Sequence, residues 1–241
     1  MDITGKAVLV TGANRGIGKA LVEEALRRGV ARVYAGTRRP LSHPDGRVVP
    51  VTLDVTDAAH IRAAVERVDT LDVLVNNAGV LEFDDLADRE LLDRMLAVNF
   101  YGVRDVTMAF LPKLVEGGGA VASNISVNGF VALPLSASYS ISKAAVLAMS
   151  QSLRAILASR GVSVHSILTG PVDTDMTAGL EIAEKASPEL VARNILDGIE
   201  EGAEDIFPDP LSQGLADDWR AGLHKALERQ FASVYEAATR G

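Results

Sequence analysis

Short apolar runs alternate with stretches of helical periodicity along most of this sequence. The runs cover residues 7–10, 32–36, 48–53, 71–75, 119–125 and 162–168, and helical patterns end at Gly29 and cover about residues 58–68, 91–114 and 138–159. Apolar runs of this length are typical of strands buried on both faces. The alternation predicts a doubly wound α/β fold, with a mostly parallel sheet and helices on both faces. At 241 residues and 48% hydrophobic, the chain fits one domain covering residues 1–241.

The first apolar run leads directly into a glycine-rich turn at residues 11–18, and a helical pattern follows. In such a unit the glycines let the backbone approach a pyrophosphate, whose charge lies at the helix N-terminus. Gly12, Gly16 and Gly18 follow the spacing G-x-x-x-G-x-G rather than the usual dinucleotide pattern G-x-G-x-x-G. The position after the first predicted strand favours dinucleotide binding over an ordinary turn between a strand and a helix.

The end of the second predicted strand bears on which dinucleotide is bound. An acidic residue there would bind the ribose 2′-hydroxyl of NAD. Here Thr37 and Arg38 follow the strand, and Arg15 of the glycine turn could face the same ribose. Two cations without a carboxylate favour the 2′-phosphate of NADP(H) over NAD(H), although the arginines could also be ordinary solvated surface residues.

Small and polar residues also follow the other predicted strands. They include Asp54, the run Asn76-Asn77-Ala78-Gly79, Ser126, and the run from Gly170 to Thr174. Ligands of open parallel sheets bind beyond the C-terminal ends of the strands. We therefore expect these residues to line one edge of the sheet together with the glycine turn.

Tyr139 and Lys143 are four residues apart in a helical pattern, which places both side chains on one helix face. A free tyrosine loses its proton near pH ~10, and a nearby cation favours the phenolate and lowers that pKa. The two residues are therefore a plausible acid/base pair. By itself this spacing is weak, since it occurs by chance in many helices where the side chains make only a surface contact.

Composition argues against several other classes of function. The chain has no cysteine, which rules out disulfides and thiolate chemistry and fits a cytoplasmic protein. Its net charge of -8 and the lack of a basic patch argue against nucleic acid as a partner. The four histidines are far apart, so we expect no metal site. We also expect no membrane span and no signal peptide, because no apolar run is long enough and the N-terminal pattern is absent.

Over about residues 5–176 the chain resembles the short-chain dehydrogenase/reductase family, whose members have a Rossmann fold. The resemblance rests on the glycine motif at residues 11–18, on Asn76-Asn77-Ala78-Gly79, and on Asn99, Ser126, Tyr139 and Lys143, which match the family's catalytic tetrad in order and spacing. It implies a cofactor site made of Gly12, Asn14, Arg15, Gly16, Ile17, Gly18, Thr37, Arg38, Asp54, Val55, Asn77, Ala78, Gly79, Tyr139, Lys143, Pro171, Val172 and Thr174.

The resemblance implies hydride transfer between a nicotinamide cofactor and a carbonyl/alcohol pair, as in an NADP-dependent carbonyl reductase or alcohol dehydrogenase. Tyr139 would donate or accept the oxygen-bound proton, and Ser126 would hydrogen-bond the substrate oxygen. Lys143 would bind the nicotinamide ribose and lower the pKa of Tyr139. Asn99 would hold a water that links Lys143 to solvent.

The small-molecule substrate is expected to be an apolar ketone or aldehyde, because apolar residues follow the relevant strands. These residues are Leu81, Phe83, Phe130, Leu133, Met176 and Leu180, although many of them could simply be core. Two alternatives stay open: a non-catalytic NADP-binding regulatory or signalling protein on the same fold, and a sugar epimerase or dehydratase. The intact tetrad counts against the first, and the short chain counts against the second.

The chain departs from the family pattern after the sixth predicted strand and at its end. Thr169 stands where the family usually has proline, and the family's Asp-Gly-Gly tail, which builds a tetramer interface, is replaced by a longer segment. Trp219, Leu223, Leu227 and Phe231 recur there every four residues and predict an amphipathic helical extension at about residues 211–239. Packing on its own domain is its expected role. We expect a homodimer or homotetramer joined through the helices at residues 91–114 and 138–159.

Overall fold

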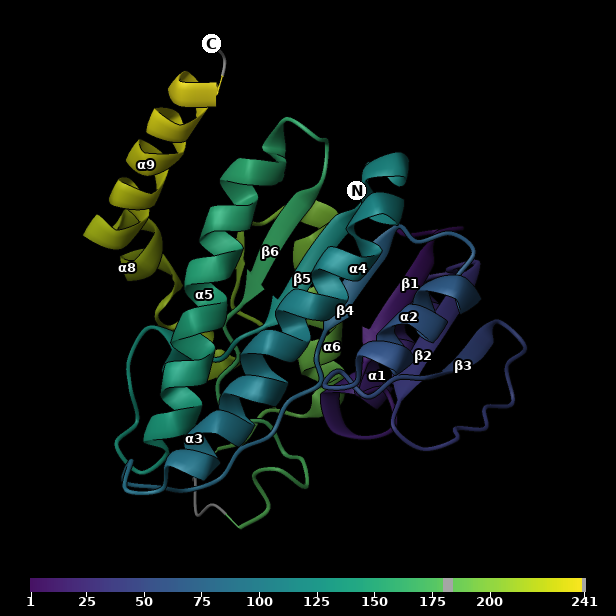
Figure 1. The fold of residues 1–241 in the computed structure, drawn as a ribbon, viewed down its shortest axis with the longest axis horizontal. Coiled ribbons are helices and arrows are strands. Elements are labelled where there is room, and N and C mark those ends of the chain that lie inside the picture. Colours follow the sequence, from purple (N-terminus) through teal and green to yellow (C-terminus); the bar gives the residue numbers. More distant parts are fainter. Residues whose placement is uncertain (180–183, 240–241) are drawn as a thin grey trace.

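Seven parallel strands form one sheet in a computed structural model of the chain, which describes residues 1–179 and 184–239. They are β1 (Ala7–Thr11), β2 (Arg32–Thr37), β3 (Val48–Thr52), β4 (Val73–Asn76), β5 (Ala120–Asn124), β6 (Ser163–Ile167) and β7 (Asp205–Ile206), in the spatial order β3-β2-β1-β4-β5-β6-β7 (Figure 1). The predicted doubly wound fold is confirmed, and every strand pair is parallel. The short edge strand β7 lies outside the six predicted strands.

Helices cover both faces of this sheet. They are α1 (Gly16–Arg27), α2 (Ala58–Arg67), α3 (Arg89–Leu96), α4 (Gly102–Gly117), α5 (Ala137–Ala158), α6 (Pro188–Glu201), and the C-terminal α7 (Pro210–Gln213), α8 (Ala216–Ala221) and α9 (Leu223–Thr239). α1 and α6 pack on one face, and α2, α4 and α5 on the other (Figure 1). The central strand β1 shows why its apolar run is continuous: Val8 and Val10 join the core on the α1 side, while Leu9 joins the opposite core.

The helix predicted at residues 91–114 is interrupted by a π-helical turn, η1 (Ala97–Tyr101), between α3 and α4. Asn99 lies in this turn and is fully buried. A π turn inserts one extra residue into a helix and is frequent at functional sites. The hydrophobic periodicity of the sequence does not reveal this π turn, because the helical turns on either side of it keep their apolar face toward the core.

The predicted C-terminal extension forms three helices rather than one. Trp219 of α8 is buried, and its indole nitrogen donates a hydrogen bond to the Asp205 carboxylate at 2.9 Å. The chain turns at Gly222 before α9 begins. Beyond that turn, Leu223 and Phe231 remain 73% and 65% exposed. Trp219 therefore packs on its own domain, whereas these two apolar residues of α9 do not take part in the packing.

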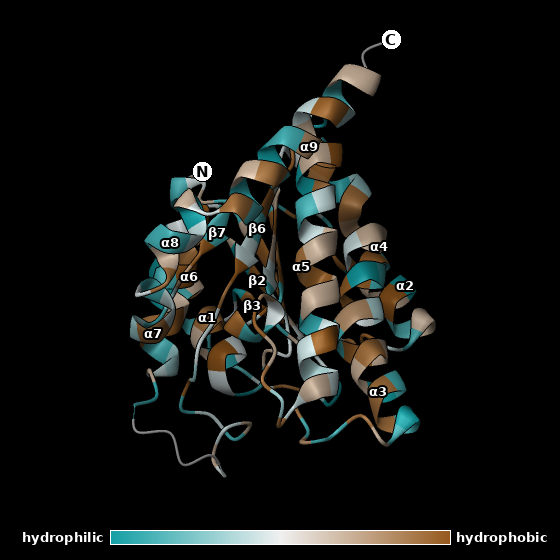
Figure 2. Ribbon diagram, turned by 90° about the vertical axis from the view of Figure 1, so that its left-hand side faces the viewer, coloured by the Kyte–Doolittle hydropathy of each residue, from teal (hydrophilic) through white to brown (hydrophobic). Residues whose placement is uncertain are grey.

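A cluster of charges holds α9 against the domain instead. The buried Lys225 ammonium lies 2.7 Å from Asp205 and 3.0 Å from Glu228, and Arg154 of α5 pairs with the same two carboxylates. Because the buried cations have carboxylate partners, the cost of removing them from water is offset. α9 thus turns a charged side toward the protein and apolar residues toward solvent, and Figure 2 shows hydrophobic residues recurring along α9 as it extends past α5.

Candidate functional site

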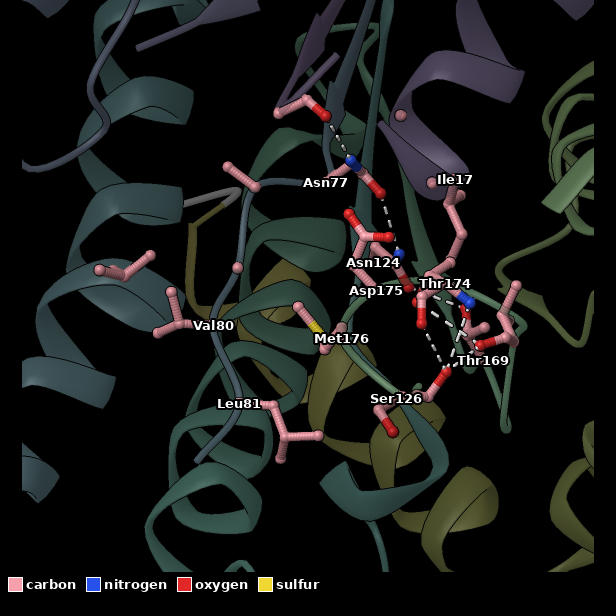
Figure 3. Close-up of a pocket in the computed structure, with 18 of the residues that line it drawn as sticks. Ile17, Asn77, Val80, Leu81, Asn124, Ser126, Thr169, Thr174, Asp175 and Met176 are labelled. Atoms are coloured by element: carbon pink, nitrogen blue, oxygen red, sulfur yellow. Dashed lines mark hydrogen bonds between the residues drawn. The ribbon is translucent and has the colours of Figure 1, made fainter. Parts of the chain in front are cut away.

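A cavity of about 900 Å³ opens at the C-terminal ends of the strands, around the switch in strand order between β1 and β4. Every residue predicted to contact a cofactor lines it, together with Ser126. Among the predicted catalytic and cofactor-binding residues, all of which lie in the described part of the chain, Asn99 alone is outside the lining. The sequence prediction that polar strand ends meet at one edge is therefore correct, and Figure 3 shows part of the wall they form.

The glycine turn is shaped to admit a ligand close to the backbone. A Cβ atom at Gly18 would lie 2.1 Å from the Gly12 carbonyl oxygen, so only glycine fits there. Gly12 has φ +68, and a Cβ on it would lie 3.0 Å from the Ala78 Cα. Helix α1 begins at Gly16 without a side-chain cap, which leaves its first amide groups available to an anion. These features fit a dinucleotide pyrophosphate.

Hydrogen bonds across four strand ends fix the floor of the cavity. The Thr11 hydroxyl accepts from the backbone amides of Asn77 and Ala78, at 2.9 Å each. The Asn124 amide donates to the Asn77 side-chain oxygen at 3.2 Å, and the Thr169 hydroxyl donates to the Asn124 side-chain oxygen at 2.8 Å. The threonine in place of the family's proline therefore adds a hydrogen bond that proline could not make.

Tyr139 and Lys143 lie one turn apart near the start of α5, as predicted. The Lys143 ammonium lies 5.5 Å from the centroid of the Tyr139 ring and donates to the Asn124 carbonyl oxygen at 2.7 Å. Lys143 is buried, whereas Tyr139 is half-buried at the cavity. The cation thus faces the ring and is held by a backbone carbonyl.

Burial dominates the ionisation of both groups. It raises the pKa of Tyr139 to about 12, although hydrogen bonding with the Ser126 side chain acts in the opposite direction. Burial also lowers the pKa of Lys143 to about 8. Burial thus has the largest effect on the Tyr139 pKa, and the lowering of that pKa by Lys143 stays a prediction.

Ser126 has an unusual backbone conformation directly after β5. Its φ is 122 and its ψ 154, a region that residues with a side chain rarely adopt. Its hydroxyl accepts from the Asn128 amide at 3.2 Å and so begins the short 3₁₀ turn η2 (Val127–Gly129). Backbone strain of this kind is concentrated at functional sites, where the surrounding structure maintains it.

Asn99 lies behind the cavity and ties the β4 loop to the helices. Its side-chain oxygen accepts from the Val80 amide at 2.9 Å, and its amide donates to the Val80 carbonyl at 2.9 Å and to the Ser142 hydroxyl at 3.0 Å. A Cβ on Gly79 would lie 3.3 Å from the Asn99 oxygen and 3.7 Å from the Lys143 nitrogen. Asn99 therefore supports the backbone beside Lys143, and its predicted water-holding role stays a prediction.

The end of β2 presents arginines to the cavity and no carboxylate of its own. Arg38 and Arg39 both line it, and the buried Thr37 hydroxyl donates to the Arg39 carbonyl at 2.5 Å. Burial acts to raise the pKa of Asp54, but hydrogen bonds from Thr56 and the charge of Arg38 outweigh it and leave that pKa lowered. Asp54 thus stays anionic and hydrogen-bonded within its own turn.

Arg15, predicted to face the ribose, lies at the cavity beside an acidic side chain. Its guanidinium lies 2.9 Å from the carboxylate of Asp175, in the loop that follows β6. Both side chains line the cavity and are well exposed, at 61% and 71%. The two loops lie close together at this point: a Cβ on Gly16 would be only 3.0 Å from the Thr174 methyl group.

The predicted substrate residues are only partly brought together. Leu81, Phe83, Leu133 and Met176 line the cavity, and Figure 3 shows Leu81 next to Val80, with Met176 between Leu81 and the glycine turn that carries Ile17. Phe130 does not line it, because its ring packs against Trp219 with centroids 5.1 Å apart. The remaining candidate, Leu180, lies outside the described residues.

The lining residues that the sequence analysis did not predict as site residues include Asn124, Thr169 and Asp175. The position of Asn124 at the end of an apolar run, two residues before Ser126, was a usable signal. Asp175 carried no such signal, since its partner is 160 residues away in sequence. Within residues 1–179 and 184–239, no group of three His, Asp or Glu side chains could hold a metal, and no helix could span a membrane.

Comparison with known proteins identifies the family. The model of the short chain dehydrogenases matches residues 6–185. The chain belongs to the short-chain dehydrogenase family. Among family relatives, an uncharacterized oxidoreductase of Staphylococcus epidermidis is 34% identical over 206 residues, which cover 80% of this chain and 89% of that protein. The 3-oxoacyl-[acyl-carrier-protein] reductase of Thermotoga maritima is 34% identical over 210 residues, covering 80% and 84%.

A solved structure extends the likeness to nearly the whole chain. A short chain dehydrogenase of Burkholderia cenocepacia, solved in complex with NADP, superimposes with a TM-score of 0.87 at 36% identity. The match covers 95% of this chain and 98% of that one. The protein is therefore an oxidoreductase of this family, and the shared architecture includes most of the C-terminal extension.

Proposed function

We propose that this oxidoreductase uses NADP(H) to reduce apolar ketones or aldehydes, with Tyr139 as the acid/base group. One observation carries the proposal: a single cavity joins a glycine turn fitted to a pyrophosphate, arginines at the end of β2, and Tyr139 beside Ser126 and Lys143. When bound there, the nicotinamide cofactor supplies or accepts the hydride.

The residues of the chain supply the proton and the positioning. With its pKa raised to about 12, the Tyr139 hydroxyl stays protonated at neutral pH and can donate its proton to the carbonyl oxygen of a substrate. Ser126 would hydrogen-bond the same oxygen and stabilise the charge that develops on it. Lys143, held by the Asn124 carbonyl, would provide positive charge and hydrogen bonds on the cofactor side. The carbonyl carbon thus receives the hydride and the carbonyl oxygen receives the proton, which gives the alcohol.

The cofactor preference rests on charge at the end of β2. A 2′-phosphate adds about -1.5 to -2 charges, and Arg38 can bind phosphate oxygens with its planar fork. A partly exposed charge contact of this kind contributes roughly 1 kcal/mol or more, so we expect Arg38 alone to give a preference of roughly fivefold or greater for NADPH. The NADP-bound Burkholderia relative supports this choice. Arg38→Ala should reduce the preference, measured as kcat/KM with both cofactors, whereas Arg39→Ala is a matched control with a smaller expected effect.

The substrate class rests on the apolar side of the cavity. Leu81, Phe83, Leu133 and Met176 provide it, and binding pockets are mostly apolar with a few placed polar groups. The Thermotoga relative, named for reducing a 3-oxoacyl group, supports a carbonyl as the reacting group. Turnover confined to charged or polyhydroxylated compounds, in a panel of ketones, aldehydes and sugars, would contradict this assignment.

Tyr139→Phe is the central test, because phenylalanine keeps the ring and removes the proton. We expect NADPH oxidation by a ketone or aldehyde to fall by roughly 100- to 10,000-fold, while NADPH still binds. The alternative of a non-catalytic NADP-binding protein predicts instead that the wild type oxidises no NADPH with any member of the panel. If Tyr139→Phe keeps the turnover of the wild type, a group other than Tyr139 must transfer the proton.

A further inference from the structure

We propose that Asp175 is a specificity-determining residue for the cofactor, because its carboxylate competes with the 2′-phosphate for the guanidinium of Arg15. The proposal rests on the NADP(H) preference proposed above and adds a residue that opposes it. Its basis is the ion pair that joins the glycine turn to the loop after β6, on the rim of the cofactor cavity.

Both residues are held where competition can occur. Arg15 immediately precedes helix α1, so its backbone is fixed at the glycine turn that receives the pyrophosphate. Asp175 follows Thr174, whose methyl group borders Gly16 of the same turn. The loop that carries Asp175 is fastened by Thr177, which donates to the Val172 carbonyl. In Figure 3, Thr174, Asp175 and Met176 follow one another along the cavity wall, with Ile17 of the glycine turn nearby.

The charges around Arg15 make the exchange selective for a phosphorylated ribose. Arg15 has one anionic partner in the described part of the chain, Asp175, at 2.9 Å. A phosphate monoester brings more charge and more acceptor oxygens than one carboxylate. NADP(H) can therefore displace Asp175 from Arg15, whereas NAD(H) offers only a hydroxyl at this position and leaves the ion pair in place. Asp175 thus weakens the binding of NADP(H) selectively.

The size of the effect follows from exposure. Arg15 and Asp175 are 61% and 71% exposed, and an ion pair between exposed side chains contributes about 0–1 kcal/mol. Removing the competitor should therefore tighten the binding of a 2′-phosphate by up to about fivefold. Added salt screens such pairs, so the gain should shrink as ionic strength rises.

A double-mutant cycle tests the competition directly. Binding of NADPH, NADH and the probe adenosine 2′,5′-bisphosphate would be titrated with wild type, Asp175→Asn, Arg15→Met and the double variant. Asp173→Asn is the matched control, because it removes one charge from the same loop. Among the described residues, Asp173 makes no ion pair with Arg15. We expect Asp175→Asn to tighten NADPH and the probe by up to about fivefold and to leave NADH unchanged. In the Arg15→Met background this gain should disappear.

Two results would overturn the proposal. One is an equal gain from Asp175→Asn with and without Arg15, which would make Asp175 a general repulsive charge. The other is no gain at all while the wild type binds the bisphosphate probe. Failure of the proposed cofactor preference looks different: the wild type would then bind NADH as tightly as NADPH, whatever the variants do.

Discussion

Ser126 shows how a single position can combine strain and chemistry. Its hydroxyl lies at the cavity and its φ of 122 belongs to a region that favours glycine, yet a serine stands there. A conformation of this kind costs roughly 1–3 kcal/mol. The chain therefore gives up stability to present a hydroxyl group where glycine would be the most stable choice.

This cost predicts that glycine at position 126 gives a more stable protein than alanine, whereas alanine is usually the more stable of the two. Ser126→Ala and Ser126→Gly both remove the hydroxyl, but only glycine relieves the strained φ. We expect Ser126→Gly to be more stable than Ser126→Ala by about 1 kcal/mol in chemical denaturation, with both variants nearly inactive. Equal stability of the two variants would mean that the backbone at this position is relaxed.

Lys143 predicts a pH dependence of cofactor use. With its pKa lowered to about 8, the ammonium loses its proton as the pH rises through that value, and positive charge near the cofactor is lost. Because kcat/KM reports ionisations of the free enzyme, we expect kcat/KM for NADPH to fall above about pH 8. Lys143→Arg, which stays charged, should be less active but should not show this decline. A flat wild-type profile between pH 7 and 10 would contradict the lowered pKa.

At the scale of elements, α5 depends on a cap from another part of the chain. Ser136, which precedes α5, provides no side-chain cap. Asp84 from the β4 loop supplies the cap instead: its carboxylate accepts from the Ser138 amide at 3.0 Å and from the Ser138 hydroxyl. These hydrogen bonds, that of the Ser138 hydroxyl first, lower the pKa of Asp84. The start of the helix that carries Tyr139 is thereby fixed to the loop that carries Phe83.

Removal of this cap should destabilise the protein. We expect Asp84→Ala to lower the free energy of unfolding by about 0.5–2 kcal/mol at neutral pH, the range for a lost N-cap. Asp85→Ala is a matched control, because within the described residues Asp85 accepts only from the nearby Ala87 amide. Since the folded-state pKa of Asp84 is lowered, its contribution is complete above the unfolded-state pKa and is lost as the pH falls through the folded-state value. The two variants should therefore converge in acid.

At the scale of the whole molecule, the sequence was enough to predict the features that depend on local residue patterns, namely the strands and the glycine turn. Apolar runs predicted six strands because a parallel sheet buries both faces of each strand, and the glycine turn was recognisable because Gly18 has no room for a Cβ. Pairings between distant segments left no local signal. The ion pair of Arg15 with Asp175 and the cluster around Lys225 depend on which loops and helices the fold brings together. The apolar residues of α9 do recur at helical spacing, but the charged cluster around Lys225 determines which side of the helix faces the protein.

The exposed faces of α4 and α5 support the proposed homodimer or homotetramer. On α5, Ile141, Ala144, Ala148 and Ile156 form an exposed stripe at helical spacing, and Met108 of α4 is 45% exposed. Burial of such surface favours association. We expect light scattering to show an assembly, and Ala148→Arg to dissociate it; Ser152→Ala, on the same exposed face, is the conservative control. A wild-type monomer at micromolar concentration would rule out this assembly.

The orientation of α9 has a practical consequence in dye-based melting experiments. Fluorophores such as anilinonaphthalene sulfonate become bright on open apolar surface, which ordinarily appears only as a protein loosens. Here Leu223, Phe231 and Val234 already present such surface in the folded chain. A native sample with α9 uncovered would start from a bright baseline and show a shallow rise on heating. Baseline brightness would then measure how much of that helix is covered.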